Sequence, residues 1–339
     1  MKAKSFLFLF LCLITSCSNS RIGQFEQIPA SIKSVKTEIF LSDQKTLNMF
    51  YDMALLDTCV VLADFYSDSL IQVRSLTNPD YCVRNLYKGN GPDEYKQPYF
   101  NREVRPDDNS LLFSDINLRK FGKMTWNQGI LTVKDEFMPA DFPSGNSLNE
   151  TSRFIYGINA ELNENGLFFI WDKSNNSLIK QVDYYPDKTS EYDKSSWSFL
   201  YQSDICVNEQ AKTLVCVLLN MNLLHFYDLE GNVQKTFQVG NRLMLPDTHS
   251  QTLDFSESDK YFMQVCGSKE YVFALYNGKE LQDGASEILV FDWSGKFIER
   301  YKSDKPFVRI AVDNAGKNLL GIHINGEGGT DVFRIILPK

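Results

Sequence analysis

Long apolar runs are scarce in this 339-residue chain. The longest continuous one, Phe6 to Ile14, is too short to cross a bilayer, because a membrane-spanning helix needs about 20 apolar residues. No later stretch reaches the roughly 18 residues that mark a candidate span. We therefore expect no transmembrane helix, and any membrane attachment has to come from another part of the chain.

Positively charged residues are also fewer than negatively charged ones. The chain has 35 Lys and Arg against 43 Asp and Glu, which gives a net charge of -8. Removal of the first sixteen residues, which contain Lys2 and Lys4, changes this to -8 - 2 = -10. Binding to a polyanion depends on clustered Lys and Arg, so this composition argues against a nucleic-acid partner.

Residues that usually bind metals or act as nucleophiles are few and badly spaced for those tasks. The three histidines occur at His225, His249 and His323. None belongs to an H-x-H, H-E-x-x-H or H-x-x-E-H motif, and no G-x-S-x-G motif is present. We therefore predict no metal, no cofactor and no catalytic residue from local motifs.

The seven cysteines cannot form a simple disulfide framework. Besides Cys12 and Cys17, five remain in the body of the chain, and five cannot all pair within one chain. Each lies in or beside an apolar run, which favours buried free thiols that pack as small hydrophobic groups. Cys206 with Cys216, on neighbouring candidate strands, is the one pair left open as a disulfide.

What the sequence does contain begins with a secretory signal. Lys2 and Lys4 precede the short apolar run, which ends in Leu13-Ile14-Thr15-Ser16-Cys17. This order is typical of a removable signal peptide over residues 1–16. The last five residues resemble the bacterial lipobox, which implies that Cys17 becomes the N-terminus and carries acyl chains such as palmitate. Residues 17–30 are then expected to be a lipidated tether.

The residues that follow Cys17 bear on the location. By the sorting logic of enterobacteria, Ser18 rather than Asp after the cysteine favours the outer membrane. The stretch Ser18-Asn19-Ser20-Arg21 has no acidic run of the kind that resembles surface-export signals. We expect a lipid-anchored envelope protein, in the outer membrane and facing the periplasm.

The body of the chain repeats short strand-like runs between clusters of Gly, Asn and Asp. The clearest copy has strands at 288–292 and 296–301 joined by a turn through Asp292 and Gly295, followed by strands at 307–312 and 318–324. Glycine allows the positive φ of tight hairpin turns, and Asp accepts their backbone hydrogen bonds. Diverged copies over 166–182 and 205–237 follow the same order. The chain is therefore predicted to be all-β.

Repeats of about 40 to 50 residues with four strands each are typical of propeller blades. We predict a single six-bladed β-propeller domain over 31–339, with four-stranded antiparallel blades. The expected blades are 52–100, 101–150, 151–198, 199–250, 255–303 and 306–337. The stretch from Val35 to Leu41 is expected to complete the last blade beside Val332 to Leu337, which closes the ring.

A short motif connects this fold to a known family. Tyr87-Lys-Gly-Asn-Gly-Pro-Asp-Glu-Tyr95 contains Gly89, Gly91, Pro92 and Glu94. With the lipobox and the six-blade spacing, it resembles the G-x-G-P-x-E-aromatic segment of TolB-like six-bladed β-propeller lipoproteins of Gram-negative envelopes. The resemblance covers essentially the whole mature chain and implies the fold, but it implies no enzymatic activity.

From the residues themselves, the motif is predicted to be a rigid turn between blades. Gly89 and Gly91 are expected to adopt backbone conformations closed to other residues, Pro92 fixes φ, and Glu94 accepts backbone hydrogen bonds. A loop that also touches a ligand is the alternative. The motif is not a phosphate-binding loop, because no Lys-Ser/Thr pair follows it.

A possible recognition surface is predicted around a tyrosine-rich loop. Tyr184 and Tyr185 begin it, Trp197 follows it, and His249 lies in another polar loop as a candidate inner-face ligand. The other two histidines alternate with apolar residues, so we expect them to be packed strand residues.

These observations favour a non-catalytic binding or scaffold lipoprotein, which presents one ring face to a protein, peptide or glycan. Two alternatives stay open. One is a propeller hydrolase, lactonase or lyase with a site at the channel mouth, where several acids, a His or a metal would converge. The other is a regulatory partner of a nutrient-uptake system.

Overall fold

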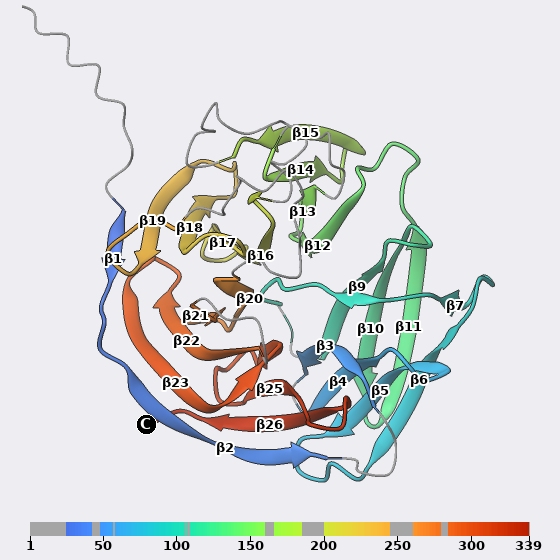
Figure 1. The fold of residues 1–339 in the computed structure, drawn as a ribbon. Coiled ribbons are helices and arrows are strands. Elements are labelled where there is room, and N and C mark those ends of the chain that lie inside the picture. The colour runs from blue at the N-terminus through green and yellow to red at the C-terminus, as the bar shows by residue number, and fades with distance from the viewer. Residues whose placement is uncertain are drawn as a thin grey trace, which may run out of the picture.

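The computed structural model describes residues 25–42, 48–56, 58–105, 107, 109–159, 166–184, 200–244, 260–278 and 284–338. Across these residues strands dominate and are arranged as a set of curled sheets around a common centre (Figure 1). Among the same residues, no helix has the length and hydropathy that a membrane crossing requires. The prediction of an all-β propeller is confirmed.

The first three sheets follow the order of the chain. Unit 1 contains β3 (Phe50–Leu55), β4 (Cys59–Asp64), β5 (Ser69–Ser75), β6 (Cys82–Lys88) and the short β7 (Glu94–Tyr95). Unit 2 contains β8 (Tyr99–Phe100), β9 (Ser110–Asp115), β10 (Lys120–Asn127) and β11 (Ile130–Phe137). Unit 3 contains β12 (Gly145–Glu150), β13 (Phe154–Asn159), β14 (Phe168–Asp172) and β15 (Ser177–Val182).

The second half of the chain repeats this plan. Unit 4 contains β16 (Ser203–Asn208), β17 (Thr213–Leu218), β18 (Leu223–Asp228) and β19 (Val233–Val239). Unit 5 contains β20 (Phe262–Gly267), β21 (Tyr271–Tyr276), β22 (Ala285–Asp292) and β23 (Phe297–Phe307). Unit 6 contains β24 (Arg309–Val312), β25 (Leu319–Ile324), β26 (Thr330–Ile336) and, from the N-terminus, β2 (Lys33–Leu41).

The innermost strands of these units close a ring. The first strand of each unit contacts the first strand of the next one, in the order β3, β8, β12, β16, β20 and β24, and β24 contacts β3 again. The expected closure of the last unit is confirmed, because β2 pairs antiparallel with β26, with Lys36 opposite Ile336. The boundary between units 2 and 3 lies earlier than predicted, since β12 begins at Gly145 rather than after 150.

Burial along the strands explains why these runs form sheets packed face to face. Every residue of β4 is buried, because both faces of an inner strand lie against neighbouring units. By contrast, β11 at the outer edge of unit 2 is exposed at most of its positions. The continuous apolar runs therefore mark inner strands, and the mixed runs mark outer ones.

The turn chemistry expected from the sequence is present. Asp292 accepts hydrogen bonds from the backbone N–H of Ser294 (2.9 Å) and Lys296 (3.0 Å), and Gly295 has a φ of +76°. A side chain tolerates this left-handed conformation poorly, which is why glycine is favoured there. Asp228 and Asp313 form corresponding turns with Asn232 and Lys317 as the N–H donors.

The N-terminal segment covers the outer edges of three consecutive units. The strand β1 (Glu26–Ile28) pairs parallel with β19, and β2 pairs parallel with β23 before it joins β26. Unpaired strand edges invite association with other chains, and this outer strap covers them (Figure 1). We call residues 26–41 the outer strap. Part of the expected tether over 17–30 is therefore attached to the ring from Glu26 onward.

The cysteines of the described residues behave as predicted. Cys59, Cys206, Cys216 and Cys266 are buried thiols that form no disulfide among the described residues, whereas Cys82 is only half-buried and likewise forms none. The pairing that was left open does not form. Cys206 is opposite Val215 and Cys216 is opposite Ile205, so the two cysteines occupy non-paired, adjacent positions of β16 and β17.

Candidate functional site

All six innermost strands, or the residues just beside them, line one cavity of about 370 Å³ at the centre of the ring. Its charged residues are Asp52, Arg102, Asp204 and Arg309. Three of these come from the first residues of β3, β16 and β24, so the cavity lies at the end of the ring where those strands begin. We call this cavity the central cup and this end of the ring the cup face.

One buried ion pair forms part of the floor of the cup. The guanidinium of Arg102 contacts the carboxylate of Asp52, whose side chain has no exposed surface. The second carboxylate oxygen of Asp52 accepts the backbone N–H of Phe100 at 2.8 Å. Burial alone lowers the pKa of Arg102, but the neighbouring Asp52 and Asp204 carboxylates outweigh it and raise that pKa above its ordinary value. Arg102 therefore stays charged.

A second carboxylate is held on the opposite wall. Asp204 accepts a hydrogen bond from the hydroxyl of Ser147 on β12 and another from the backbone N–H of Val265 at 3.0 Å. Ser147 has a φ of +49°, which non-glycine residues rarely adopt, and the register of β12 shifts beside it. Strained backbone of this kind recurs where a side chain has to be aimed at a site. The strain here places a hydroxyl against a cup carboxylate.

Among the residues that the structure describes, one connecting segment occupies the centre of the ring below the cup. Residues 101–105, between β8 and β9, lie in the centre and contact β3, β16 and β12. The backbone N–H of Val104 donates to the carbonyl of Val207 at 2.7 Å, and the side-chain amide of Asn314 donates to the carbonyl of Arg105 at 3.1 Å. Figure 1 shows this connection entering the middle of the ring near β20. We call residues 101–105 the channel plug.

The plug itself carries one buried carboxyl group, at Glu103. One of its oxygens accepts the backbone N–H of Glu150 at 3.1 Å. Burial raises the pKa of Glu103 to about 7, because a carboxylate loses hydration when it is enclosed. Glu103 lines a much smaller cavity on the far side of Arg102, together with Arg105 and Cys266.

A row of aromatic side chains leads outward from the cup. Tyr99 lines the cup and lies edge-on to Tyr51 with 5.4 Å between ring centroids, and Tyr51 is 6.4 Å from Phe65. Phe65 is 5.6 Å from Tyr66 and has the ammonium of Lys88 above its ring at 5.3 Å. Phe65 and Tyr66 are 44% and 62% exposed. This aromatic row belongs to the same face as the cup, because Phe65 and Tyr66 follow the end of β4, which pairs antiparallel with β3.

The arrangement is suited to holding polar and aromatic groups. Asp52 accepts three hydrogen bonds from other residues and Asp204 accepts two, so both cup carboxylates are fixed as acceptors with defined directions. The buried side-chain N–H₂ of Gln264 has no hydrogen-bond partner among the described residues, although its carbonyl oxygen accepts the N–H of Ile310 at 2.8 Å. No group of three or more His, Cys, Asp and Glu side chains in the described residues could hold a metal ion.

The glycine motif lies at the outer edge of unit 1. Glu94 accepts the backbone N–H of Gly91 at 2.7 Å, as predicted, and the ammonium of Lys120 on unit 2 contacts the carbonyl oxygens of Pro92 and Glu94. The predicted reason for the glycines is wrong, because neither Gly89 nor Gly91 has a positive φ. A Cβ on Gly89 would overlap the Glu94 carboxylate, and one on Gly91 would lie 3.0 Å from it. The glycines make room for Glu94.

The predicted recognition surface is not supported at the residue that can be checked. Tyr184 is buried and its ring packs on Tyr201 with 4.6 Å between centroids, which makes it a core residue. The prediction that Tyr184 belongs to a recognition surface is therefore wrong, because its ring completes the core of units 3 and 4. Tyr185, Trp197 and His249 lie outside the described residues, as does Cys17.

The two remaining histidines are strand residues, as predicted. His225 on β18 is buried, its Nδ1 lies 2.9 Å from the Thr236 hydroxyl, and burial lowers its pKa to about 3. His323 on β25 lies 2.9 Å from the carbonyl oxygen of Pro306. Neither lines the cup.

The cup residues were missed from sequence, although a signal exists. The runs Ile205-Cys-Val-Asn208 and Ile310-Ala-Val-Asp313 resemble each other as inner strands. The residue before each run is Asp204 or Arg309, and both line the cup. A polar residue just before the first apolar strand of each repeat is therefore the mark of a cup residue.

Comparisons with known proteins agree with this architecture. The profile of the TolB-like 6-blade propeller-like family matches residues 26–315. A member of the DUF4221 family from Bacteroides vulgatus has a similar structure, with a TM-score of 0.61, 14% identity, and coverage of 91% of this chain and 100% of that one. A protein from Bacteroides fragilis, named as a candidate exported protein, has a TM-score of 0.56 at 12% identity, with coverage of 93% and 99%. No curated protein sequence matches the chain.

Proposed function

The chain belongs to the TolB-like 6-blade propeller-like family, and we propose that it is a non-catalytic binding lipoprotein of the cell envelope. In this proposal Cys17 carries the lipid anchor, and the cup face binds a protein or peptide partner. The observation that carries the proposal is the convergence of all six innermost strands on one central cup that continues into the exposed aromatic row.

The chemistry of this face favours a polypeptide partner. Aromatic residues and Arg are enriched where proteins bind one another, and a few of them contribute most of the binding energy. Phe65 and Tyr66 supply exposed rings, and Arg309 supplies a half-buried guanidinium at the cup. The fixed carboxylates give the cup acceptors and the Arg309 guanidinium gives it donors, which suits the polar end or side chain of a peptide.

The anchor and the location rest on the N-terminal sequence. The lipobox-like residues 13–17 favour acylation at Cys17, and several acyl chains give stable attachment where one would not. The exported relative supports placement outside the cytoplasm. The outer strap begins at Glu26, so only a short segment separates Cys17 from the ring. A Cys17→Ala variant is expected to take up no labelled palmitate and to leave the membrane fraction, and unchanged labelling would contradict the anchor.

Site-specific crosslinking tests the cup face directly. A photoreactive amino acid replaces Tyr66 on the cup face in one version of the acylated protein and Tyr81 on the opposite face in another. After irradiation of intact envelopes, we expect one defined protein to be crosslinked from position 66 and not from position 81. Adding Arg309→Ala is expected to abolish that crosslink, because Arg309 lines the cup.

Two results would count against this proposal. One is the absence of any protein crosslinked from position 66. The other is a crosslink that persists at full strength in the Arg309→Ala variant, since it would reflect general stickiness of the exposed rings rather than recognition at the cup.

A further inference from the structure

A second and larger cavity, of about 510 Å³, lies between units 1 and 2 at the end of the ring opposite the cup face. Its residues come from the segments that join β3 to β4, β5 to β6, β8 to β9 and β10 to β11, and from the strand ends beside them. In an antiparallel unit these connections share one end, and the β4–β5 turn that carries Phe65 and Tyr66 lies at the other. We call this cavity the interblade pocket.

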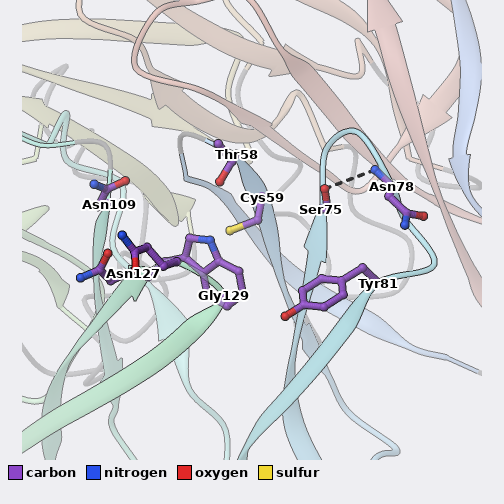
Figure 2. A pocket seen from close by; sticks show the side chains of 10 residues that line it. Thr58, Cys59, Ser75, Asn78, Tyr81, Asn109, Asn127 and Gly129 are labelled. Atoms are coloured by element: carbon purple, nitrogen blue, oxygen red, sulfur yellow. Dashed lines mark hydrogen bonds between the residues drawn. The ribbon is translucent and has the colours of Figure 1, made fainter.

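The two walls of the pocket belong to different units of the ring. Ser75, Asn78 and Tyr81 belong to unit 1, whereas Asn109 and Asn127 belong to unit 2. Figure 2 shows the Tyr81 side chain, from the residue just before β6, extending toward the turn at Gly129, with the amides of Asn109 and Asn127 on the far side. The Tyr81 hydroxyl lies 3.2 Å from the position that a Cβ on Gly129 would occupy, so the tyrosine reaches across the gap.

The lining of this pocket is neutral, in contrast to the cup. None of its ten residues is charged, although 23% of the chain is. Five are Ser, Thr or Asn, one is Gln128, and two are the aromatic residues Tyr81 and Trp126. Hydroxyl and amide groups both donate and accept hydrogen bonds, as a ligand with many hydroxyl groups requires.

The two aromatic residues of the pocket add an exposed ring face for stacking and a hydrogen-bond donor. Tyr81 is 46% exposed, so its ring is open to solvent. Trp126 is mostly buried but borders the pocket, and no acceptor among the described residues bonds to its indole N–H, whereas the indole N–H of Trp293 donates to Ser268 at 2.9 Å. An aromatic ring has a negative face, which attracts the weakly positive C–H groups on one side of a pyranose ring.

We propose that the interblade pocket binds a short neutral oligosaccharide. One sugar ring stacks on Tyr81, and its hydroxyls exchange hydrogen bonds with Asn109, Asn127 and the Trp126 indole N–H. The volume falls within the roughly 300–1,000 Å³ of small-molecule sites. Because no cation is among the described residues that line the pocket, acidic sugars have no charge partner from them. This site is separate from the cup and does not depend on the partner proposed for the cup face.

Calorimetric titration of the mature protein tests the proposal. The probes are the neutral trisaccharides of glucose, mannose and N-acetylglucosamine, with the trimer of galacturonic acid as the acidic comparison. We expect at least one neutral trisaccharide to bind and the acidic trimer to bind more weakly than it. Tyr81→Ala is expected to weaken binding about tenfold, which corresponds to about 1.4 kcal/mol, because it removes the aromatic face on which the sugar ring stacks.

The matched control is Tyr66→Ala, which removes an exposed tyrosine from the opposite face. It should leave sugar binding unchanged, and so should Arg309→Ala, the variant that tests the cup face, so the two proposals can fail separately. Trp126→Phe, which keeps an aromatic ring and loses the N–H, should also weaken binding. The proposal is wrong if none of the neutral trisaccharides binds, or if Tyr81→Ala binds as tightly as the native protein.

Discussion

The centre of the ring and its outer edge are held together in different ways. At the centre, the plug is bound through buried charged groups, Arg102 to Asp52 above all, and through hydrogen bonds to several units. At the outer edge, the strap pairs through its backbone with three units, and its ion pair between Lys33 and Glu299 is exposed on the lysine side.

The difference shows where charge matters for this fold. A buried charge that loses its partner has no water to replace it, so its removal is costly. An exposed pair can be replaced by hydration, and backbone pairing does not depend on side-chain charge. The centre should therefore respond strongly to single charge changes and to pH, whereas the edge should respond to steric changes and hardly at all to charge.

The largest effect is expected for Asp52→Ala. It leaves the Arg102 guanidinium enclosed without its carboxylate and removes the acceptor of the Phe100 N–H. Breaking a buried pair in this way costs about 3–5 kcal/mol. Urea unfolding should show this as a lower midpoint with an unchanged slope. A loss below about 1 kcal/mol would mean that the centre does not depend on this pair.

A smaller effect, confined to one pH range, is expected for Glu103→Gln. Burial raises the pKa of Glu103 to about 7, so the unfolded chain ionises this group at lower pH than the folded protein does. The native protein therefore loses stability as the pH rises from about 4.5 through about 7, and a neutral Gln is spared that loss. The variant should be more stable than the native protein at pH 8, by on the order of 1–3 kcal/mol, and nearly equal to it at pH 4.

The matched control for this prediction lies at the edge. Glu38 on the outer strap is exposed, so Glu38→Gln should give the same stability difference at both pH values. If Glu103→Gln also shows no dependence on pH, the carboxyl group in the plug is not held protonated in the folded protein.

A steric change at the edge comes next. Gly89→Ala places a methyl group where the Glu94 carboxylate lies, and moving that carboxylate loses its bond to the Gly91 N–H. We expect a loss of about 1–2 kcal/mol. In a Glu94→Ala background the same change should cost much less, because the obstacle is gone. An equal cost in both backgrounds would indicate a backbone requirement at Gly89 instead.

Sequence patterns predicted the fold because its determinants are local. Asp292 and Gly295 fix a hairpin through bonds within five residues, and the strand that closes the ring is recognisable from its own composition. Side-chain packing between distant residues could not be predicted from local sequence in this way. A glycine at position 89 could be required either for a positive φ or for space, and the sequence looks the same in both cases. Only the position of the Glu94 side chain in the structure shows that space is the reason.

The cup was missed for a related reason. It draws on residues from Asp52 to Arg309, and only closure of the ring brings them together. In the sequence, each looks like an ordinary polar residue before an apolar strand. Tyr184 shows the opposite error, because a tyrosine beside a polar loop looks exposed until the core of two adjacent units is assembled around it.

The smallest effect is expected for Lys33→Ala, which removes the exposed half of the strap's ion pair with Glu299. The Lys33 side chain is 64% exposed, and β2 remains paired with β23 and β26 through its backbone. We therefore expect no measurable change in the urea midpoint at moderate salt, since screening weakens the pair and water solvates both charges. A clear loss that disappears at high salt would show that charge does stabilise the strap. In that case the edge, like the centre, would depend on its ion pairs, and the contrast between the two regions would not hold.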